Sequence, residues 1–232
     1  VAKLAKSIDD HRLDIRDGES LKRLISEIQP DFVFHLAAQP LVRLSYLNPV
    51  ETYQTNVLGT LNLLEALRFL EKPCTTVLIT SDKCYKNVEW VWGYRETDTL
   101  GGPDPYSASK AAAELVIHSH VKSFFPRSGP VLVAVGRAGN VIGGGDWAQD
   151  RIVPDCVRSW AKDESVQLRK TLATRPWQHV LEPLGGYLTL ASELHQKNEL
   201  HGEPFNFGPS THQNHTVLDL VQAMSEHWDQ VR

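Results

Sequence analysis

The chain lacks the features that mark several classes of protein. No run of apolar residues approaches the roughly 18 that are needed to cross a bilayer, and the Lys and Arg residues are scattered along the sequence rather than clustered. The formal net charge is -4, and 41% of the 232 residues are hydrophobic. We therefore expect no membrane span and no nucleic-acid partner, and we expect an ordinary globular protein with a sizeable core.

Cysteine and methionine are also scarce. Cys74, Cys84 and Cys156 show no metal-ligand spacing, so we expect reduced thiols and no metal site. The first six residues lead straight into charged sequence and form no secretory signal, which together with the free thiols predicts a cytoplasmic protein. The single methionine is Met224, so Val1 is not a natural start, and we expect a piece of a longer protein, truncated at both ends.

Short apolar runs alternate with segments of helical period. The pattern predicts helices over 21–29, 49–70 and 105–125, and buried strands over 31–36, 75–80 and 131–135. Such alternation is typical of a doubly wound α/β fold with a parallel sheet. From residue 138 onward glycine, tryptophan and proline become frequent, so we expect a sheet domain over 1–137 and a smaller mixed lobe over 138–232, with late elements returning to the sheet.

Tyr106 and Lys110 are four residues apart on a predicted helix, which Asp104-Pro105 would start. Residues with this spacing share one helix face. A phenol normally keeps its proton until about pH 10, and a nearby ammonium group lowers that value, so Tyr106 is a candidate base. The spacing alone is more typical of a solvated helix face than of a catalytic pair.

The context of this pair favours a catalytic site. Thr80, Ser81, Asp82 and Lys83 follow directly after a predicted buried strand. In open parallel sheets, ligands bind at the carboxyl ends of the strands. The sequence therefore predicts that these polar side chains lie at a ligand-binding edge.

Further motifs run through almost the whole chain. They are His35–Pro40 (HLAAQP), Thr55–Thr60 (TNVLGT), Trp90–Glu96 (WVWGYRE), Arg137–Trp147 (RAGNVIGGGDW) and Arg175–Val180 (RPWQHV). Together with the tyrosine helix, this set resembles the extended short-chain dehydrogenase/reductase family of NAD-dependent epimerases and dehydratases. The Ser-Asp-Lys triplet, the Trp-rich loop and the Gly-Gly-Gly-Asp-Trp run narrow the resemblance to the branch that acts on CDP-glucose.

The resemblance implies a Rossmann-like NAD-binding fold and the dehydration of CDP-glucose to CDP-4-dehydro-6-deoxyglucose, a step towards the deoxysugars of cell-surface polysaccharide. Tyr106 would take the proton of the C4 hydroxyl, Lys110 would lower the tyrosine pKa and hold the nicotinamide ribose, and Ser81 would hydrogen-bond the C4 oxygen. Water elimination across C5 and C6 needs an acid and a base. We expect Asp82 as the acid and Lys83 as the base; the alternative is that Lys83 only pairs with a phosphate or a carboxylate.

The resemblance also implies binding residues. For NAD they are Asp14, Ile15, Leu36, Ala37, Ala38, Gln39, Asn56, Thr80, Tyr106 and Lys110. For the substrate they are Ser81, Asn140, Arg175 and His179, although Asn140 also suits a turn cap and His179 a structural histidine. Family members begin with a glycine-rich turn, and no G-x-x-G-x-x-G lies in this chain, so we expect the first βαβ element to be missing and do not expect tight NAD binding by these residues alone.

Three further expectations remain. The helices at 49–70 and 105–125 would form a homodimer interface, as is common in the family. Trp90, Trp92 and Trp147 suit aromatic core packing better than stacking on substrate. A C4 epimerase and a non-catalytic or inert nucleotide-sugar-binding fragment stay open as alternatives; the Asp82-Lys83 pair argues against the first, and the missing glycine turn favours the second.

Overall fold

The computed structural model describes residues 7–210 and 212–228. They belong to two compact units. The first unit combines the chain up to residue 138 with residues 184–207, and the second combines 139–183 with the residues from 208 onward. The chain thus leaves the first unit after its third strand and returns to it for a helix and a fourth strand.

A parallel sheet of four strands forms the centre of the first unit. The strands are β1 (Phe32–His35), β2 (Cys74–Ile79), β3 (Val131–Ala138) and β7 (Pro204–Phe207), and they lie in that order. Each neighbouring pair is parallel. All carboxyl ends therefore meet at one edge, as the predicted α/β architecture requires.

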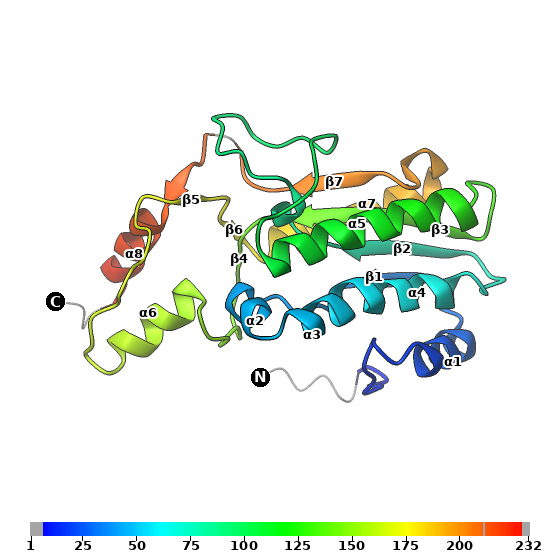
Figure 1. Ribbon diagram of the computed structural model, residues 1–232, viewed down its shortest axis with the longest axis horizontal. Coiled ribbons are helices and arrows are strands. Elements are labelled where there is room, and N and C mark those ends of the chain that lie inside the picture. Colours follow the sequence, from blue (N-terminus) through cyan, green and yellow to red (C-terminus); the bar gives the residue numbers. More distant parts are fainter. Residues whose placement is uncertain (1–6, 211, 229–232) are drawn as a thin grey trace. The chain divides into compact units, whose positions relative to one another are not determined.

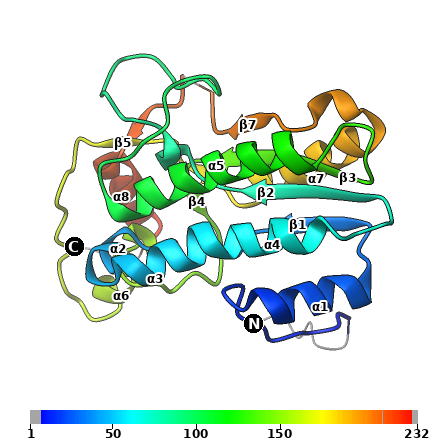
Figure 2. The same cartoon turned by 45° about the vertical axis from the view of Figure 1, so that its right-hand side comes forward.

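Helices cover both faces of this sheet. The helices of the unit are α1 (Gly18–Ile28), α2 (Val42–Leu47), α3 (Pro49–Tyr53), α4 (Gly59–Leu67), α5 (Pro105–Phe124) and α7 (Leu181–Gln196). Figures 1 and 2 show α3, α4 and α5 in front of the strands and α7 behind them. The doubly wound, Rossmann-like fold is confirmed.

The predicted helix over 49–70 is not one regular α-helix. It runs from α3 through a π-helical turn, η2 (Gln54–Leu58), into α4. The backbone N–H of Gly59 bonds to the carbonyl of Gln54, five residues back. Single π turns of this kind occur often at functional sites, and hydrophobic periodicity does not reveal them, because the apolar stripe continues across the turn.

Two hydrophobic clusters hold the layers together. One lies between the sheet and the front helices. It contains Leu64, Leu67, Leu78 and Val133, which are all fully buried. The other includes Val77 and buries Tyr187 and Leu194 of α7 against the opposite face. Full burial of one such aliphatic side chain contributes about 1.5–3 kcal/mol, so these layers fix the strand ends that carry polar groups.

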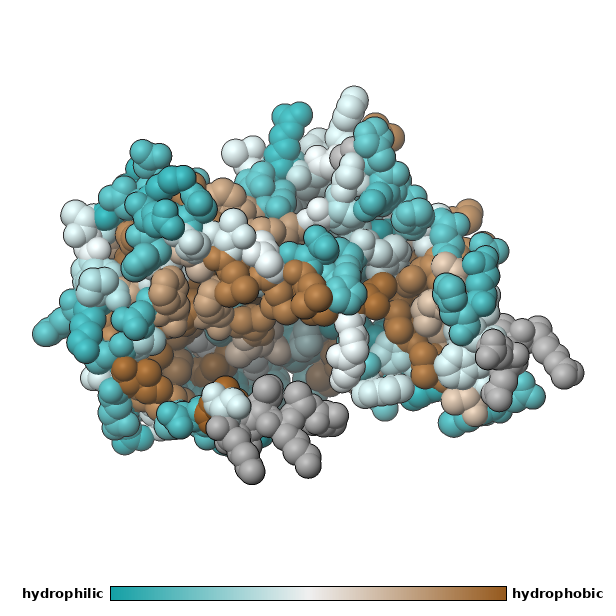
Figure 3. Space-filling model, turned by 180° about the vertical axis from the view of Figure 1, so that it is seen from behind, coloured by the Kyte–Doolittle hydropathy of each residue, from teal (hydrophilic) through white to brown (hydrophobic). Residues whose placement is uncertain are grey.

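The prediction of a fully buried strand over 31–36 is wrong. Within β1 only His35 is buried, and Phe32 is 44% exposed. The reason is the position of β1 at the edge of the described sheet, where it pairs with β2 alone. Figure 3 shows a broad apolar area on the rear face. Exposed apolar side chains in or directly after β1 include Phe32 and Leu36, and those on α7 include Leu184 and Leu188.

The second unit consists of short elements. It contains the helices α6 (Ile152–Trp160) and α8 (Val217–Glu226), the pair β4 (Val141–Ile142) with β6 (Gln178–His179), and the pair β5 (Thr174–Arg175) with β8 (His215–Thr216). Thr216 caps α8: its hydroxyl accepts from Asp219 N, while the Asp219 carboxylate accepts from Thr216 N. The assignment of residues 138–232 as a substrate lobe stays a prediction.

Three expected absences can be examined in the described part of the chain. No helix there is long and apolar enough to cross a membrane. No group of three or more His, Cys, Asp or Glu side chains there is arranged to hold a metal ion. Cys74, Cys84 and Cys156 are all buried free thiols.

Candidate active site

The N-terminus of α5 places Tyr106. Asp104 caps this helix by accepting a 3.0 Å hydrogen bond from Ser107 N, and Pro105 occupies the first turn. The backbone N–H of Tyr106 donates to Ser45 Oγ at 3.1 Å, so the start of α5 is tied to α2. Tyr106 is only 7% exposed. The predicted helix start is confirmed, and Tyr106 is a buried residue of its first turn.

Lys110 lies one turn along α5 and is 6% exposed. Its Nζ donates to the carbonyl of Ile79, the last residue of β2, at 3.4 Å. Burial lowers the pKa of Lys110 to about 8, because the charged form loses its hydration, and the carboxylate of Glu114 partly offsets this. The ammonium form is therefore still the major one at pH 7, beside the tip of β2.

The chain bends sharply after β2. Residues Asp82–Cys84 form a 3-10 turn, η3, and the Ser81 hydroxyl caps it by accepting from Lys83 N. The same hydroxyl donates to Asp82 Oδ1 at 3.0 Å. On a flat strand neighbouring side chains point to opposite faces; this turn instead allows Asp82 and Lys83 to act in the same place.

Asp82 and Lys83 form an ion pair. Lys83 Nζ lies 3.0 Å from Asp82 Oδ1, and the two side chains are 33% and 31% exposed. The alternative in which Lys83 pairs with a carboxylate thus matches a contact that the structure contains. The base role of Lys83 stays a prediction.

Cys84 and His35 are neutral neighbours of the site. Burial raises the pKa of the Cys84 thiol to about 12, and the side chain packs with Tyr85 and Ala111. Burial lowers the pKa of His35 to about 4, and the charge of Lys110 adds to this effect. The His35 Nε2 contacts Thr60 Oγ1 at 3.2 Å. Cys84 is thus a packing residue, as expected, and His35 is a buried neutral histidine.

The segment after β1 is held by Asn56 of the π turn. Asn56 Oδ1 accepts from Gln39 N at 2.8 Å, and its Nδ2 donates to Gln39 O and to Ser109 Oγ. Leu36 and Ala37 are exposed at the end of β1, and Ala38 is half-buried. Asn56 therefore fixes the backbone between β1 and α2 against α5, and its predicted contact with the cofactor stays a prediction.

Asp14 and Ile15 lie next to α4. Asn62 Nδ2 donates to the Ile15 carbonyl at 2.9 Å, and the Ile15 side chain packs against Gly59 so closely that a Cβ there would lie 2.5 Å from Cδ1. The Arg16 guanidinium hydrogen-bonds the Asp14 carboxylate and lowers its pKa to about 2. The predicted adenine-flanking segment is thus anchored to the first unit.

The remaining predicted substrate residues belong to the second unit. Asn140 accepts a backbone hydrogen bond from Gln178 N at 3.0 Å, within the β4–β6 region. The Arg175 Nη1 donates to Thr174 O at 2.7 Å. His179 Nδ1 accepts from Leu181 N at 3.3 Å. Their roles in substrate binding stay predictions.

The expectation of core packing for the three singled-out tryptophans is wrong. Trp90 is 46% exposed and lies against the Tyr94 ring, 5.3 Å between centroids. Trp92 and Trp147 are 73% and 61% exposed. Aromatic composition alone does not separate a core position from one in a surface loop.

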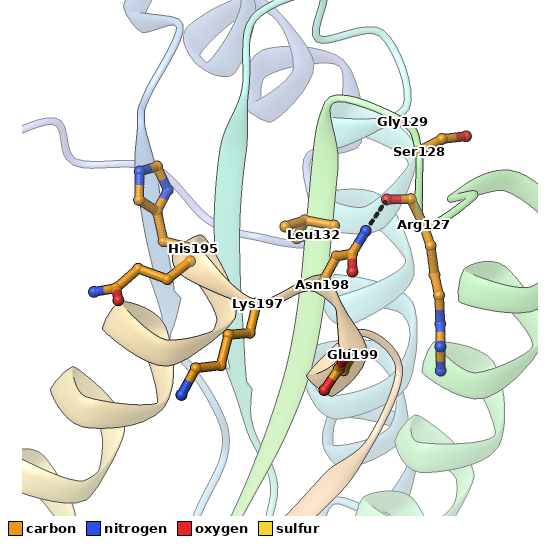
Figure 4. Close-up of a pocket in the computed structure, with 9 residues that line it drawn as sticks. Arg127, Ser128, Gly129, Leu132, His195, Lys197, Asn198 and Glu199 are labelled. Atoms are coloured by element: carbon orange, nitrogen blue, oxygen red, sulfur yellow. Dashed lines mark hydrogen bonds between the residues drawn. The ribbon is translucent and has the colours of Figure 1, made fainter.

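A surface pocket lies at the opposite end of the strands. It is lined by the loop before β3 and by the chain between α7 and β7, including Arg127, His195 and Lys197 (Figure 4). Asn198 Nδ2 donates to Arg127 O across it at 3.4 Å. Because the pocket lies at the amino ends of the strands, it is separate from the tip of β2.

The sequence reasoning missed a buried ion pair behind the site. Glu114 of α5 and Arg137 of β3 are 5% and 4% exposed, and Arg137 Nη2 lies 2.8 Å from Glu114 Oε2. The hydroxyl of Thr80 donates to the same carboxylate. The signal was present, since Glu114 is four residues after Lys110 on the same helix face.

Comparison with known proteins gives the family. The family model described as GDP-mannose 4,6 dehydratase matches residues 2–229. The chain belongs to this family. It is a homologue of the CDP-glucose 4,6-dehydratase of Salmonella typhimurium, with 49% identity over 98% of the chain, and it spans 65% of the length of that relative.

Solved structures share the fold of this chain. The structure of RMD from Pseudomonas aeruginosa complexed with NADPH is 28% identical, with a TM-score of 0.78 over 93% of this chain and 70% of that one. The dTDP-glucose 4,6-dehydratase DesIV from Streptomyces venezuelae, with NAD and DAU bound, matches with a TM-score of 0.80 at 23% identity, over 95% of this chain and 65% of that one. The second match supports the fold alone.

Proposed function

We propose that the protein dehydrates CDP-glucose to CDP-4-dehydro-6-deoxyglucose with NAD. The observation that carries the proposal is that Lys110, one helical turn from Tyr106 on α5, donates to the last residue of β2, directly before the Ser81-Asp82-Lys83 turn. A tyrosine and a lysine suffice for oxidation at C4. An additional carboxylate–amine pair beside them is what water elimination requires, and a C4 epimerase has no use for it.

The residues at this edge fit the nicotinamide end of NAD. Leu36 and Ala37 are exposed directly after β1, and the amine of Lys110 lies at the end of β2. We assign Ala38, Gln39 and Thr80 to the same surface, and Asp14 and Ile15 to the adenine side. The sequence contains no G-x-x-G-x-x-G, so we assign no pyrophosphate contact within these residues.

When bound, NAD would supply the oxidation at C4 and the matching reduction at C6. Tyr106, as the phenolate, would take the proton of the C4 hydroxyl, and the ammonium of Lys110 would stabilise that phenolate. The Ser81 hydroxyl would orient the C4 oxygen. Asn140, Arg175 and His179 would bind the nucleotide and the sugar, where the planar guanidinium of arginine suits phosphate oxygens.

The 4-keto group acidifies the proton at C5. We assign Lys83 to remove that proton and Asp82 to protonate the departing C6 hydroxyl. These roles need Lys83 as the neutral amine and Asp82 as the neutral carboxyl, and the 3.0 Å contact between Lys83 Nζ and Asp82 Oδ1 would let one proton pass from the ammonium to the carboxylate before elimination. The same contact equally supports a narrower role in which Lys83 only holds Asp82 in place.

A substitution at Lys83 tests the elimination step in the full-length enzyme. We expect Lys83→Met to exchange the C4 hydrogen with the cofactor but to form no 4-keto-6-deoxy product, and Lys83→Glu to retain elimination. Lys86→Met, in the same loop and exposed, is the matched control. Product is followed by the absorbance of the 4-keto sugar in alkali. A fully active Lys83→Met would remove Lys83 as the base, and wild-type enzyme that releases an epimer would overturn the dehydratase proposal.

We also propose a homodimer through the segments 49–70 and 105–125. The helices in these segments lie on the same face of the sheet (Figures 1 and 2). Val50 and Leu115 are 69% and 62% exposed there, and apolar patches of this kind mark association sites. Analytical ultracentrifugation should give a dimer for the wild type and a monomer for Val50→Glu with Leu115→Glu; an unchanged mass would overturn the interface.

A further inference from the structure

The buried ion pair between Glu114 and Arg137 lies directly behind the candidate active site. Arg137 binds the carboxylate with two prongs: Nε donates to Oε1 at 2.9 Å and Nη2 to Oε2 at 2.8 Å. Burial by itself lowers the pKa of Arg137, but the hydrogen bonds and charge of Glu114 more than compensate, so the net pKa is raised. Arg137 is therefore charged, and its two-pronged contact fixes the geometry of the pair.

The third guanidinium nitrogen of Arg137, which does not contact Glu114, links the ion pair to the neighbouring loop and strand. This atom, Nη1, donates to Tyr85 OH at 2.8 Å and to Glu96 O at 2.9 Å. Tyr85 OH in turn donates to Asn206 Oδ1 on β7 at 2.7 Å. The guanidinium thus cannot turn away without breaking contacts to two other segments, and Glu114 is held from behind.

The front of the Glu114 carboxylate faces the catalytic groups. The Thr80 hydroxyl donates to Oε1, and Thr80 is the residue before Ser81 at the strand tip. Glu114 also lies one helical turn from Lys110, as Lys110 lies one turn from Tyr106. A single carboxylate therefore touches the strand tip and faces the lysine.

Among the described residues, Glu114 supplies the negative charge at Lys110. The titratable groups that act on Lys110 or share its helix face are Glu114 and Tyr106 of α5, Cys84 of η3, and His35 of β1. The pKa of Cys84 is raised to about 12 and that of His35 is lowered to about 4, each by burial, so both are neutral at pH 7. Of these groups, the carboxylate of Glu114, held by Arg137, is therefore the one that stabilises the ammonium form of Lys110.

We propose that Glu114 is a positioning residue of this site: held by Arg137, its carboxylate fixes Thr80 at the strand tip and provides the negative charge that faces Lys110. The proposal rests on the function proposed above for Tyr106 and Lys110. The alternative is that the Glu114–Arg137 pair serves only to stabilise the fold. Buried ion pairs are often no more stabilising than apolar residues of similar size.

The test is Glu114→Gln in the full-length enzyme. Without the carboxylate, Lys110 should lose its proton at lower pH, so the alkaline limb of kcat/KM for CDP-glucose should move down by about one to two pH units. That is the size expected from one charge about 6 Å away at an effective dielectric constant near 20. Thr80→Val, which keeps the carboxylate, should lower kcat without moving the limb.

A direct titration separates this proposal from the proposed function. Carbon-13 NMR of protein labelled at the lysine Cε, assigned with Lys110→Arg, follows Lys110 whether or not CDP-glucose is turned over. Its titration should move down in Glu114→Gln. The matched control is Glu193→Gln, which removes the carboxylate of an exposed Glu–Lys pair at the same spacing on α7 and should change neither profile. Wild-type enzyme inactive on CDP-glucose would overturn the function, while the titration would still decide the role of Glu114.

Glu114→Gln leaves Arg137 buried and unpaired, which is strongly destabilising. The second variant therefore combines it with Arg137→Met and removes both charges; replacing both partners of a buried pair is often nearly neutral. It should show a smaller downward shift than Glu114→Gln, because it also removes the positive charge of Arg137, which lies 2.8 Å from the carboxylate. A Lys110 titration unchanged in either folded variant would overturn the proposal, as would failure of both variants to fold, because the pair would then serve the fold alone.

Discussion

Replacing Lys110 with methionine should stabilise the folded protein while abolishing its activity. The Lys110 side chain is 6% exposed, and burial lowers its pKa from 10.5 to about 8. At neutral pH the folded state therefore holds an ammonium group that would be better hydrated in the unfolded chain. Methionine keeps the unbranched apolar stem of lysine and removes the charge.

The magnitude follows from the difference between the two pKa values. Each pKa unit corresponds to about 1.4 kcal/mol, so the lowered pKa of Lys110 costs about 3 kcal/mol of stability at pH 7. Because the unfolded state binds the proton more tightly, the stability of the wild type should rise as the pH passes from about 8 towards 10.5. The advantage of Lys110→Met should be largest at and below pH 7 and should vanish above the unfolded value.

Urea unfolding followed by far-ultraviolet circular dichroism, at several pH values from 7 to 10, measures this difference. Lys86→Met is the control, because Lys86 is an exposed lysine and its replacement should change the unfolding free energy by less than about 0.5 kcal/mol. If Lys110→Met were no more stable than the wild type at pH 7, or if its advantage persisted unchanged to pH 10, the assignment of Lys110 as a strained buried charge would be refuted.

Two further predictions concern neighbours of the site. His35 is buried with its pKa lowered to about 4, so the wild type should lose up to about 3 kcal/mol of stability as the pH falls from 6.5 to 4; His35→Gln should flatten that acid limb in urea unfolding, and an unchanged limb would contradict the prediction. Gly59→Ala should place a Cβ 2.5 Å from Ile15 Cδ1 and cost about 1–3 kcal/mol, less about 1 kcal/mol of gained helix propensity. Adding Ile15→Ala should cancel the clash, and a double-mutant cycle with no coupling would rule out the contact.

The sequence was sufficient for the layout of the sheet unit, because its elements differ clearly in period. The runs 77–79 and 131–135 within β2 and β3 are apolar on both faces, as buried parallel strands are. The capped start of α5 at Asp104-Pro105 could be read directly. These signals are local, since each depends on residues within one element.

The parts that could not be predicted depend on contacts between distant segments. The π turn at Gln54–Leu58 accompanies the Asn56 amide, which bonds to Gln39 and Ser109, 17 and 53 residues away. The exposure of Phe32 depends on which strands flank β1. The hydrophobic period of a segment encodes neither the π turn nor the exposure of a strand residue. Periodicity therefore predicted the helix and the strand but not these two features.

The Glu114–Arg137 pair shows the same limit at the site itself. Its partners lie 23 residues apart in sequence on α5 and β3. The pair is linked to the site through Thr80, which follows β2 and donates a hydrogen bond to Glu114. Glu114 at one turn from Lys110 reads equally well as a surface charge. What separates the two readings is burial to 5% beside Lys110 at 6%: buried groups of opposite charge must compensate one another, and only the folded chain reveals which ones do.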